Sequence, residues 1–364
     1  IALLGSATAF VESTLAQLYK RKTQGSFIGG PAYYMKFGLR KPRMAKLYAV
    51  LITVTFCMAY ISIQSNTICA AADKAFGVPP LVMGLILVVL STLCVFGGIG
   101  RIAKVSSVIV PVMAILYVVL AVVIILMNLR LIPHVFAVIL SNAFGLQQFA
   151  GGTLGATMMN GIKRGLFSNE AGEGSAACAA SIASVSHPVK QGLVQALSVF
   201  TDTLLICSCT AFIILISGVF TTPGLNGVQL TQMALQSEIG PIGTQFVAIA
   251  IFFFAFSSII GNYTYGEMNV KFLTARKGWL TFVRVMNGVV MVFFGSLASL
   301  DLVWSLGDLF MGSITLCNLV AIVKLSPQAC FLLNDYRQQK RNGIKSPVFH
   351  RSQMPDIEKD IEAW

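Results

Sequence analysis

The chain has 364 residues, of which 56% are hydrophobic and only 11% are charged, and its mean hydropathy is +0.78. Soluble domains carry roughly 25% charged residues, so this composition excludes a soluble globular protein and indicates a protein that crosses a membrane several times. The net charge of +12 does not indicate nucleic-acid binding, because there is no soluble basic domain to bind it. In a membrane protein such an excess of positive charge usually marks the cytoplasmic loops.

The eight cysteines and the first residues say little about function. The cysteines lie in apolar segments without a CxxC pair or Cys/His ligand spacing, which is typical of core thiols rather than of a metal site or a disulfide framework. Residues 1–19 form an apolar helix, and the chain begins inside it without an initiator Met or a signal peptide. We therefore expect an N-terminally truncated chain.

A basic segment, residues 20–46, follows this helix. It carries eight Lys or Arg residues and no acidic residue, so we place it in the cytoplasm. Membrane spans are predicted at 47–72, 81–98 and 105–127. The first of them contains the polar run Gln64–Thr67, whose uncompensated amides would be unfavourable in lipid and should face the bundle interior. Substrate lining and interhelical hydrogen bonding both explain this run.

The segment 148–184 is the most unusual part of the chain. Its centre, residues 161–175, combines four glycines with four charged residues between apolar flanks. Buried charge and loose backbone are both unfavourable in a continuous membrane helix. A helix that is broken near the bilayer midplane can use them, because its freed amides and carbonyls and the dipole ends of two half-helices can hold a small zwitterion and its coupling ion. The alternative is a short cytoplasmic loop between two spans.

The positions of the basic segments help to decide between these two structures. The chain ends in a polar, basic region from residue 325, which the charge rule also places in the cytoplasm. If 148–184 crosses the membrane once, eight predicted crossings separate the two basic regions, and both lie on one side. If it is a loop between two spans, the count is nine and they lie on opposite sides. The broken helix is therefore favoured.

Two further clusters of polar residues lie in predicted spans. Asp202 is about a third of the way into the span 192–217, where an acid binds or relays an ion, or else pairs helices. Ser257 and Ser258 lie in the span 241–264. Adjacent hydroxyls are hard oxygen ligands of the sort that Na⁺ prefers; alternatively, they bond to the preceding helical turn. Both interpretations stay open for each cluster.

The remaining segments complete a membrane domain. A short lid-like helix is predicted around 230–237, in a polar stretch between spans. Spans at 279–299 and 302–324 close the domain. The predicted organisation is therefore a transmembrane transporter domain, residues 1–324, followed by a cytoplasmic C-terminal tail, residues 325–364.

Several motifs together resemble the alanine or glycine:cation symporter family, and the resemblance covers essentially the whole chain. The most specific motif is RGLFSNEAGEGSA at 164–176. One position departs from the family pattern, since Glu173 stands where a Leu or Met is expected; this Glu either tunes coupling or faces a watery inner vestibule. The other motifs are FVESTLAQLYK at 10–20, GGPAYYM at 29–35, FTDTLLICSCTA at 200–211, FAFSSIIGN at 254–262, YGE at 265–267 and LNDYR at 333–337.

The resemblance implies an all-α polytopic membrane protein with the LeuT-type inverted-repeat transporter fold, in an eleven-span chain. Aligned in this way, the chain lacks the first two spans and keeps about nine. One of the two broken helices of the fold would then be missing, which puts transport by this chain alone in question. The implied function is sodium-coupled symport of a small neutral amino acid, alanine or glycine, into the cell by alternating access.

The resemblance also implies a location and partners. The chain should lie in the plasma (inner) membrane with its C-terminus in the cytoplasm. Its partners should be the amino acid, Na⁺ as the coupling ion, and membrane lipid, without nucleic acid, and no other cofactor is implied. The sequence leaves open the preferred amino acid and its stereochemistry, the number of ions, the use of H⁺ in place of Na⁺, and the oligomeric state.

Site residues follow from the same resemblance. The implied substrate contacts lie in the unwound turn, on a scaffold helix and at a gating position; they are Phe167, Ser168, Asn169, Gln64 and Tyr263. The implied Na⁺ ligands form one main site and one weaker second site; they are Ser257, Ser258 and the carbonyl of Phe254, and then Asp202 or Thr203.

Three other function classes compete with symport. A substrate-gated ion channel needs a continuous polar pore, whereas the polar residues here form isolated clusters. A membrane-embedded enzyme is disfavoured, because the sequence has no HExxH, no GxSxG and no paired histidines. A non-transporting remnant of a transporter is the third class.

Overall fold

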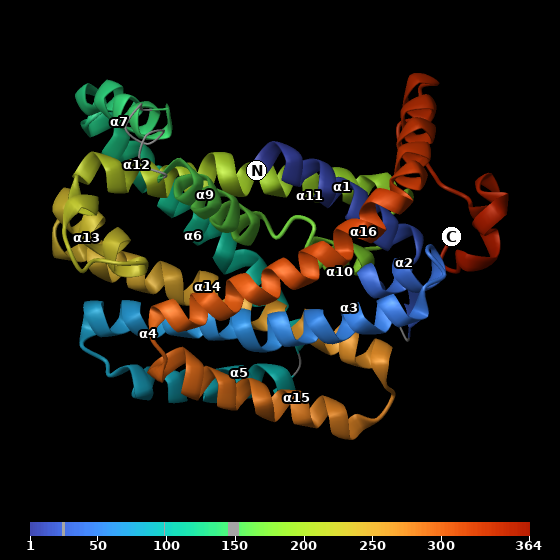
Figure 1. The fold of residues 1–364 in the computed structure, drawn as a ribbon, viewed down its shortest axis with the longest axis horizontal. Coiled ribbons are helices and arrows are strands. Elements are labelled where there is room, and N and C mark those ends of the chain that lie inside the picture. Colours follow the sequence, from blue (N-terminus) through green and yellow to red (C-terminus); the bar gives the residue numbers. More distant parts are fainter. Residues whose placement is uncertain (24–25, 98, 145–152) are drawn as a thin grey trace.

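The computed structural model describes residues 1–23, 26–97, 99–144 and 153–364. Within these ranges the chain is helical apart from one small hairpin (Figure 1). Among the described residues, six helices are long and apolar enough to cross a membrane, which confirms a polytopic membrane protein; the nine spans and the inverted repeat stay predictions. The six candidate spans are Pro42–Phe76, Ser107–Met127, Pro188–Ser217, Pro241–Leu273, Lys277–Ser296 and Leu300–Arg341, and shorter apolar helices occupy Pro80–Val95 and Leu129–Phe144.

The first part of the chain contains two separate helices with a small hairpin between them, followed by one long helix. The basic segment is less loop-like than its composition suggested, because it contains the antiparallel hairpin and a helix that begins at a proline. A π-helical turn divides the long helix into two α-helical parts. The elements are α1 (Ala2–Leu18), β1 (Arg21–Thr23), β2 (Ser26–Ile28), α2 (Pro31–Phe37), α3 (Pro42–Val54), η1 (Thr55–Tyr60) and α4 (Ile61–Phe76).

The middle of the chain contains a helix break inside the predicted segment 148–184, while a single crossing of the membrane by this segment stays a prediction. A helix ends at Asn169 and a second one begins at Ser175, so the two halves are separated by five residues that are not helical. The first part of the predicted segment, residues 148–152, lies outside the described residues. The elements are α5 (Pro80–Gly97), α6 (Ile99–Met127), η2 (Leu129–Leu131), α7 (Ile132–Phe144), α9 (Thr153–Asn169) and α10 (Ser175–Ile182).

The last part of the chain contains the longest helices. One further π-helical turn joins two α-helical parts and another ends a helix, and the helix predicted as a lid is present as α13. The elements are α11 (Pro188–Phe200), η3 (Thr201–Cys207), α12 (Ser208–Ser217), η4 (Val219–Thr221), α13 (Val228–Ile239), α14 (Pro241–Leu273), α15 (Lys277–Val290), η5 (Met291–Ser296), α16 (Leu300–Arg341), η6 (Arg351–Gln353) and η7 (Pro355–Asp360).

Apolar side chains cover much of the outer surface. Large exposed hydrophobic residues run along α5, α6, α7, α11 and α15, as expected for helices that face lipid. The largest buried cluster instead joins α1, α2, α3, η1 and α16, and it includes Tyr34, Tyr48 and Tyr60. The helix break lies against this cluster, because Tyr48 and Tyr60 bond to Glu173. Helix α13 lies at the opposite end of the molecule from the C-terminal segment (Figure 1).

The C-terminal segment packs against the loops at its own end of the molecule. Helix α16 continues past residue 324 to Arg341, so the boundary predicted at 324/325 falls inside a helix. Residues 344–364 then fold back: the Trp364 indole donates to the Gln17 carbonyl (2.8 Å), and Arg21 pairs with Glu362 (2.9 Å). The Lys20 ammonium lies 4.7 Å from the Trp364 ring centroid. These contacts tie the end of the chain to the end of α1.

His187 connects α11 to α16 at this same end. It caps α11, with Nδ1 accepting from the Val189 amide (3.2 Å) and Nε2 lying 3.0 Å from Asp335 Oδ2. The ring is buried, and Phe349 of the folded-back segment lies 5.8 Å away. Burial lowers the pKa of His187, even though the neighbouring Asp335 carboxylate acts in the opposite direction. The neutral ring satisfies both contacts at once, because Nδ1 must stay unprotonated to accept the amide.

Acidification should therefore destabilise this end of the protein. Because the pKa of His187 is lowered on folding, the unfolded chain binds more protons than the folded chain, and stability falls as the pH drops through and below about 6.5. A His187→Asn variant keeps an acceptor for the helix N-terminus but does not titrate, so its melting temperature should fall less between about pH 7.5 and pH 5.5. The exposed His134 provides the control: between these two pH values, the melting temperature of His134→Asn should fall by as much as that of the wild type. An equal loss in all three proteins would contradict this role for His187.

Candidate functional site

The break between α9 and α10 is built by residues with left-handed backbone angles. The φ angles are +45° at Glu170, +87° at Gly172 and +98° at Gly174. Glycine adopts such angles without a steric penalty, and a non-glycine residue there is uncommon. Phe167, Ser168 and Asn169 form the last turn of α9, whereas the resemblance had put them in the unwound turn. The unwound residues are Glu170 to Gly174.

Side chains from three neighbouring elements hold the break in place. The Tyr48 hydroxyl donates to the carbonyl of Glu173, and the Tyr60 hydroxyl donates to its carboxylate (2.6 Å). On the other side, Asn318 Nδ2 donates to the carbonyl of Gly172 (2.9 Å). Backbone groups freed by the break are thus bonded by the protein itself, as they must be in a non-aqueous environment.

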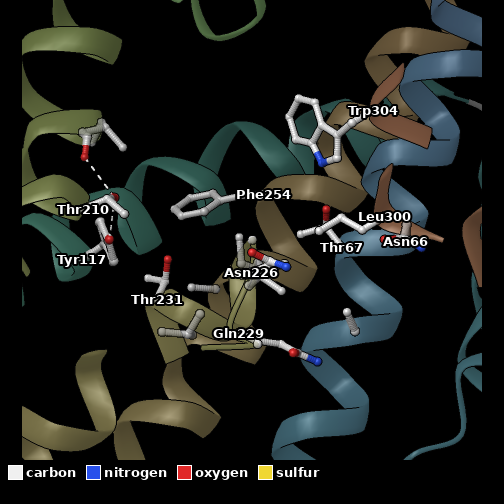
Figure 2. A pocket seen from close by; sticks show the side chains of 18 residues that line it. Asn66, Thr67, Tyr117, Thr210, Asn226, Gln229, Thr231, Phe254, Leu300 and Trp304 are labelled. Carbon is white, nitrogen blue, oxygen red and sulfur yellow. Dashed lines mark hydrogen bonds between the residues drawn. The ribbon is translucent and has the colours of Figure 1, made fainter. Parts of the chain in front are cut away.

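A cavity of about 570 Å³ lies between α4, α6, α12, α13, α14 and α16 (Figure 2). We call it the chamber. Its wall is largely apolar, and Phe254 and Trp304 contribute the large aromatic surfaces. None of the described residues that line it is charged. Hydrogen-bonding groups come from several helices and from the turn before α13; they are Asn66, Thr67, Tyr117, Thr210, Asn226, Gln229 and Thr231.

Aromatic contacts connect the chamber to the helix break. The ring of Trp304 lies 4.7 Å from that of Phe167, in the last turn of α9, and Phe167 lies 5.0 Å from Tyr60. Tyr60 in turn contacts Glu173 in the break. The Arg164 guanidinium lies 4.2 Å from the centroid of the Trp304 ring. Contacts therefore run from the wall of the chamber through the last turn of α9 to the break.

The oxygens predicted to bind Na⁺ on α14 converge on one point. The hydroxyls of Ser257 and Ser258 both donate to the carbonyl of Phe254, at 2.8 and 3.1 Å. Both interpretations of these hydroxyls, Na⁺ binding and bonding within the helix, therefore stay open. The hydroxyls donate to the preceding turn, and together with the Phe254 carbonyl they place three hard oxygens close to one another. The side chain of Phe254 faces the chamber (Figure 2), so the same residue borders the oxygen cluster and the chamber.

A second, smaller cavity of about 230 Å³ contains another group of predicted residues. The Ser168 hydroxyl donates to Asp202, and the Thr203 hydroxyl donates to Asn169, so the end of α9 is bonded to the π-helical turn η3. Asn169 is buried, and its side-chain nitrogen lacks a hydrogen-bond partner among the described residues. Ser168, Asn169 and Asp202 all line this cavity together with Glu170. Asp202 therefore links η3 to the end of α9 through its hydrogen bond with Ser168, and it also borders this cavity.

Comparison with known proteins identifies the family. The model of the sodium:alanine symporter family matches residues 1–351. The chain belongs to this family. It is 50% identical over 364 residues to the probable sodium/glutamine symporter GlnT of Bacillus subtilis, a match that covers 100% of this chain and 76% of GlnT. It is 46% identical to the amino-acid carrier protein AlsT of the same species (100% and 77%) and 34% identical to the sodium/alanine symporter AgcS of Methanococcus maripaludis (95% and 77%).

Family membership settles the function class. Members of the sodium:alanine symporter family are transporters rather than enzymes, and their coupling ion is Na⁺. The chain is therefore a multi-pass membrane protein of a family of sodium-coupled amino-acid symporters.

None of the five predicted substrate residues of this symporter lines the chamber. Ser168 and Asn169 line the smaller cavity, and Phe167 contacts Trp304 of the chamber wall. The other two lie elsewhere. Tyr263 is on another face of α14, where its hydroxyl donates to Glu267 and accepts from Arg284 Nε (2.9 Å). It is buried against α15, which does not fit a lining or gating role in the chamber. Gln64 is half-buried on α4, and its neighbours Asn66 and Thr67 line the chamber in its place.

Other lining residues of the chamber were not predicted. Trp304 lies one turn into α16, and Tyr117 and Thr210 form a hydrogen bond (2.6 Å) between α6 and α12. One signal in the sequence could have indicated Trp304, since it is one of only three tryptophans and lies in an apolar span beside Asp301 and Asp308. The pairing of Tyr117 with Thr210 joins segments that are far apart in sequence, and no local pattern indicates it.

Proposed function

We propose that this symporter carries a small neutral amino acid, alanine or glycine, together with Na⁺ into the cell by alternating access, and that the chamber is the amino-acid site. The observation that supports the proposal is the position of Phe254. Its ring borders the chamber, while its carbonyl accepts from both serine hydroxyls of the oxygen cluster. An amino acid against the ring and a Na⁺ ion on the oxygens would therefore share one residue, which gives a direct route for the binding of one to change the affinity for the other.

The chemistry of the chamber favours a neutral side chain on the substrate. The seven hydrogen-bonding residues that line it are amides and hydroxyls, which can bind the carboxylate and ammonium groups of a zwitterion. A substrate with an additional charge would bring it into the chamber without a charged partner among the lining residues, and an unpaired buried charge is strongly unfavourable. Glutamine, which GlnT is named for, is neutral as well, so size rather than charge must separate it from alanine.

The remaining proposed residues connect the ion to the moving helix. Ser257, Ser258 and the Phe254 carbonyl form the main Na⁺ site, and Asp202 with Thr203 forms a second candidate on η3, next to the end of α9. One positive charge that crosses a potential of 100 mV gains about 2.3 kcal/mol. Na⁺ and the amino acid can shift the outward–inward equilibrium only if both bind the two states with different affinity.

The orientation of the symporter follows from its charges. We propose the plasma (inner) membrane as its location, with the basic segment 20–46 and the C-terminal tail in the cytoplasm and α13 outside as the lid over the chamber. The transporter domain, residues 1–324, would have the LeuT-type inverted-repeat fold with about nine spans. The break at Glu170–Gly174 supports this, since discontinuous helices at the binding site are typical of such transporters.

A substrate series tests the proposed specificity. The melting temperature of the purified full-length protein should rise with alanine or glycine in NaCl, because a ligand that binds only the folded state stabilises it. The rise should be smaller with glutamine and absent with glutamate or lysine. A KCl buffer should reduce every shift, since Na⁺ and the amino acid are proposed to bind together. A larger shift with glutamine would make glutamine the substrate, and shifts independent of Na⁺ would contradict the shared site.

Uptake and current measurements separate a symporter from a channel and from a non-transporting remnant. Amino-acid uptake by a symporter should saturate, whereas a channel would give a current that grows with voltage without saturation. A remnant would give neither uptake nor current. The same assay should be run on this chain and on a chain of the relatives' full length, because the match covers 76% of GlnT.

A further inference from the structure

The geometry points to Glu173 as a proton-binding site inside the broken helix, so that movement of the break depends on protonation as well as on Na⁺. This inference concerns a step in transport and in that sense rests on the proposed function. It starts from the carboxyl group itself, which is 0% exposed. Tyr60 donates to Oε2 (2.6 Å), while Oε1 has no hydrogen-bond partner among the described residues.

The groups that act on Glu173 within the described ranges are acids and phenols rather than cations. Two other carboxyl groups among the described residues lie beside it: Glu170 is in the break itself, and Glu12 on α1 accepts from Asn318, which also donates to the Gly172 carbonyl. Two phenols bond to Glu173 directly, Tyr48 on α3 and Tyr60 on η1. The two positive residues of the segment 161–175 are paired elsewhere: Lys163 lies 3.4 Å from Asp308, and Arg164 also contacts Asp308.

Two more buried oxygens beside the break lack partners. Glu12 is 0% exposed; Asn318 donates to its Oε2 (2.9 Å), and its Oε1 has no hydrogen-bond partner within the described ranges. Thr315 is on the same face of α16 as Asn318, its side chain borders Gly172, and its hydroxyl is also unpartnered there. An ionised carboxylate in such a place is strongly unfavourable, whereas a protonated one is neutral and can donate to a neighbouring oxygen.

The position of Glu173 in the chain makes its proton relevant to movement. It is flanked by Gly172 and Gly174, the two glycines with positive φ angles, so it lies where the backbone of the broken helix can turn most easily. In the packed arrangement its side chain is held against η1. If α10 moves away from η1, water can reach the carboxyl group and stabilise its ionised form. Release of the proton and opening of the break are therefore linked.

The first test needs no transport. The C=O stretch of a protonated carboxylic acid is measured by infrared difference spectroscopy on the full-length protein in lipid at neutral pH, without amino acid. The wild-type band should contain a component from Glu173 that is lost in Glu173→Gln and in Glu173→Met but is retained in Glu12→Gln and Glu170→Gln, and any component from Glu12 should be lost in Glu12→Gln alone. Glutamine keeps the size of the side chain and methionine is a residue expected at this position of the family motif, so misfolding of both is not expected.

Three outcomes would overturn the assignment. The band could be missing from the wild type, or it could persist in Glu173→Gln and vanish in Glu12→Gln, which would move the proton to Glu12. It could also vanish when Na⁺ replaces choline in the buffer, which would make this a sodium site. Because the measurement is made without substrate, its result stands whether or not the protein transports alanine.

The second test measures transport. Sodium-driven uptake by the wild type should fall as the pH is raised, because deprotonation of Glu173 disfavours the packed state of the break. In Glu173→Gln this alkaline decrease should disappear while uptake at neutral pH is retained, and Glu170→Gln should keep the decrease. An unchanged pH profile in Glu173→Gln would show that its proton plays no part in the cycle. If the wild type shows no uptake at all, the proposed function fails, and only the infrared result bears on the proton.

Discussion

Replacing Gly174 with alanine is expected to abolish amino-acid uptake and to lower the melting temperature substantially. The φ angle of +98° places Gly174 in the left-handed region, where a side chain is unfavourable by about 1–3 kcal/mol. In addition, a Cβ atom at this position would overlap the Tyr48 hydroxyl and the Pro31 ring, and overpacking of this kind typically costs a further 1–3 kcal/mol or so. Thermal unfolding in detergent and uptake in proteoliposomes measure the two effects.

Two other glycines of the same segment provide graded controls. Gly172 also has a positive φ angle, but a Cβ there would make only ordinary contacts, the nearest at 3.5 Å, so Gly172→Ala should be less harmful. Gly161 lies within α9 and a Cβ there would meet open space, so Gly161→Ala should be neutral or slightly stabilising. If all three variants behaved alike, the break would not be held by the contacts described here.

Replacing both Ser257 and Ser258 with alanine is expected to raise the Na⁺ concentration for half-maximal uptake by at least about tenfold, which corresponds to about 1.4 kcal/mol of lost binding free energy. The double substitution removes the two serine hydroxyls and leaves only the Phe254 carbonyl of the three oxygens in the cluster. Both hydroxyls bond only to the preceding turn of their own helix, so their loss should affect folding little. A titration of amino-acid uptake against NaCl, at constant ionic strength, measures the shift.

A threonine of the same helix serves as the matched control. Thr264 makes the same kind of bond, from its hydroxyl to the Ile260 carbonyl (2.8 Å), but it does not line the chamber. Thr264→Val should therefore leave the sodium dependence unchanged. A normal sodium dependence in the double serine variant would remove the oxygen cluster on α14 from the ion site.

The break in the central helix could be predicted because its signal is local. Glycines and charges in an apolar segment are incompatible with a continuous membrane helix, and the structure shows the expected interruption. Its exact start could not be predicted, because the sequence alone does not say which residue leaves the helix. Glu170 does so, with a φ angle that non-glycine residues rarely adopt. The assignment of Phe167 to Asn169 to the unwound turn was consequently early by one helical turn.

The placement of Tyr263 away from the chamber could have been predicted. Successive helical residues are about 100° apart, so Tyr263 lies about 180° around α14 from Phe254, on the opposite face. The two residues therefore cannot line one chamber unless the helix is interrupted between them, and α14 is continuous.

The contacts of Ser168 with Asp202 and of Asn169 with Thr203 could not have been predicted from a local sequence pattern. They join residues that are 34 apart in sequence, and only the packing of α9 on η3 brings them together.

The most direct test of this account is the uptake of labelled alanine into proteoliposomes that contain the full-length protein, with an inward Na⁺ gradient and with an equal K⁺ gradient. The account predicts saturable uptake above the equilibrium level with Na⁺, little uptake with K⁺, and competition by unlabelled glycine. Equal uptake under both gradients, or uptake that never exceeds equilibrium, would contradict sodium-coupled symport of a small neutral amino acid through the chamber.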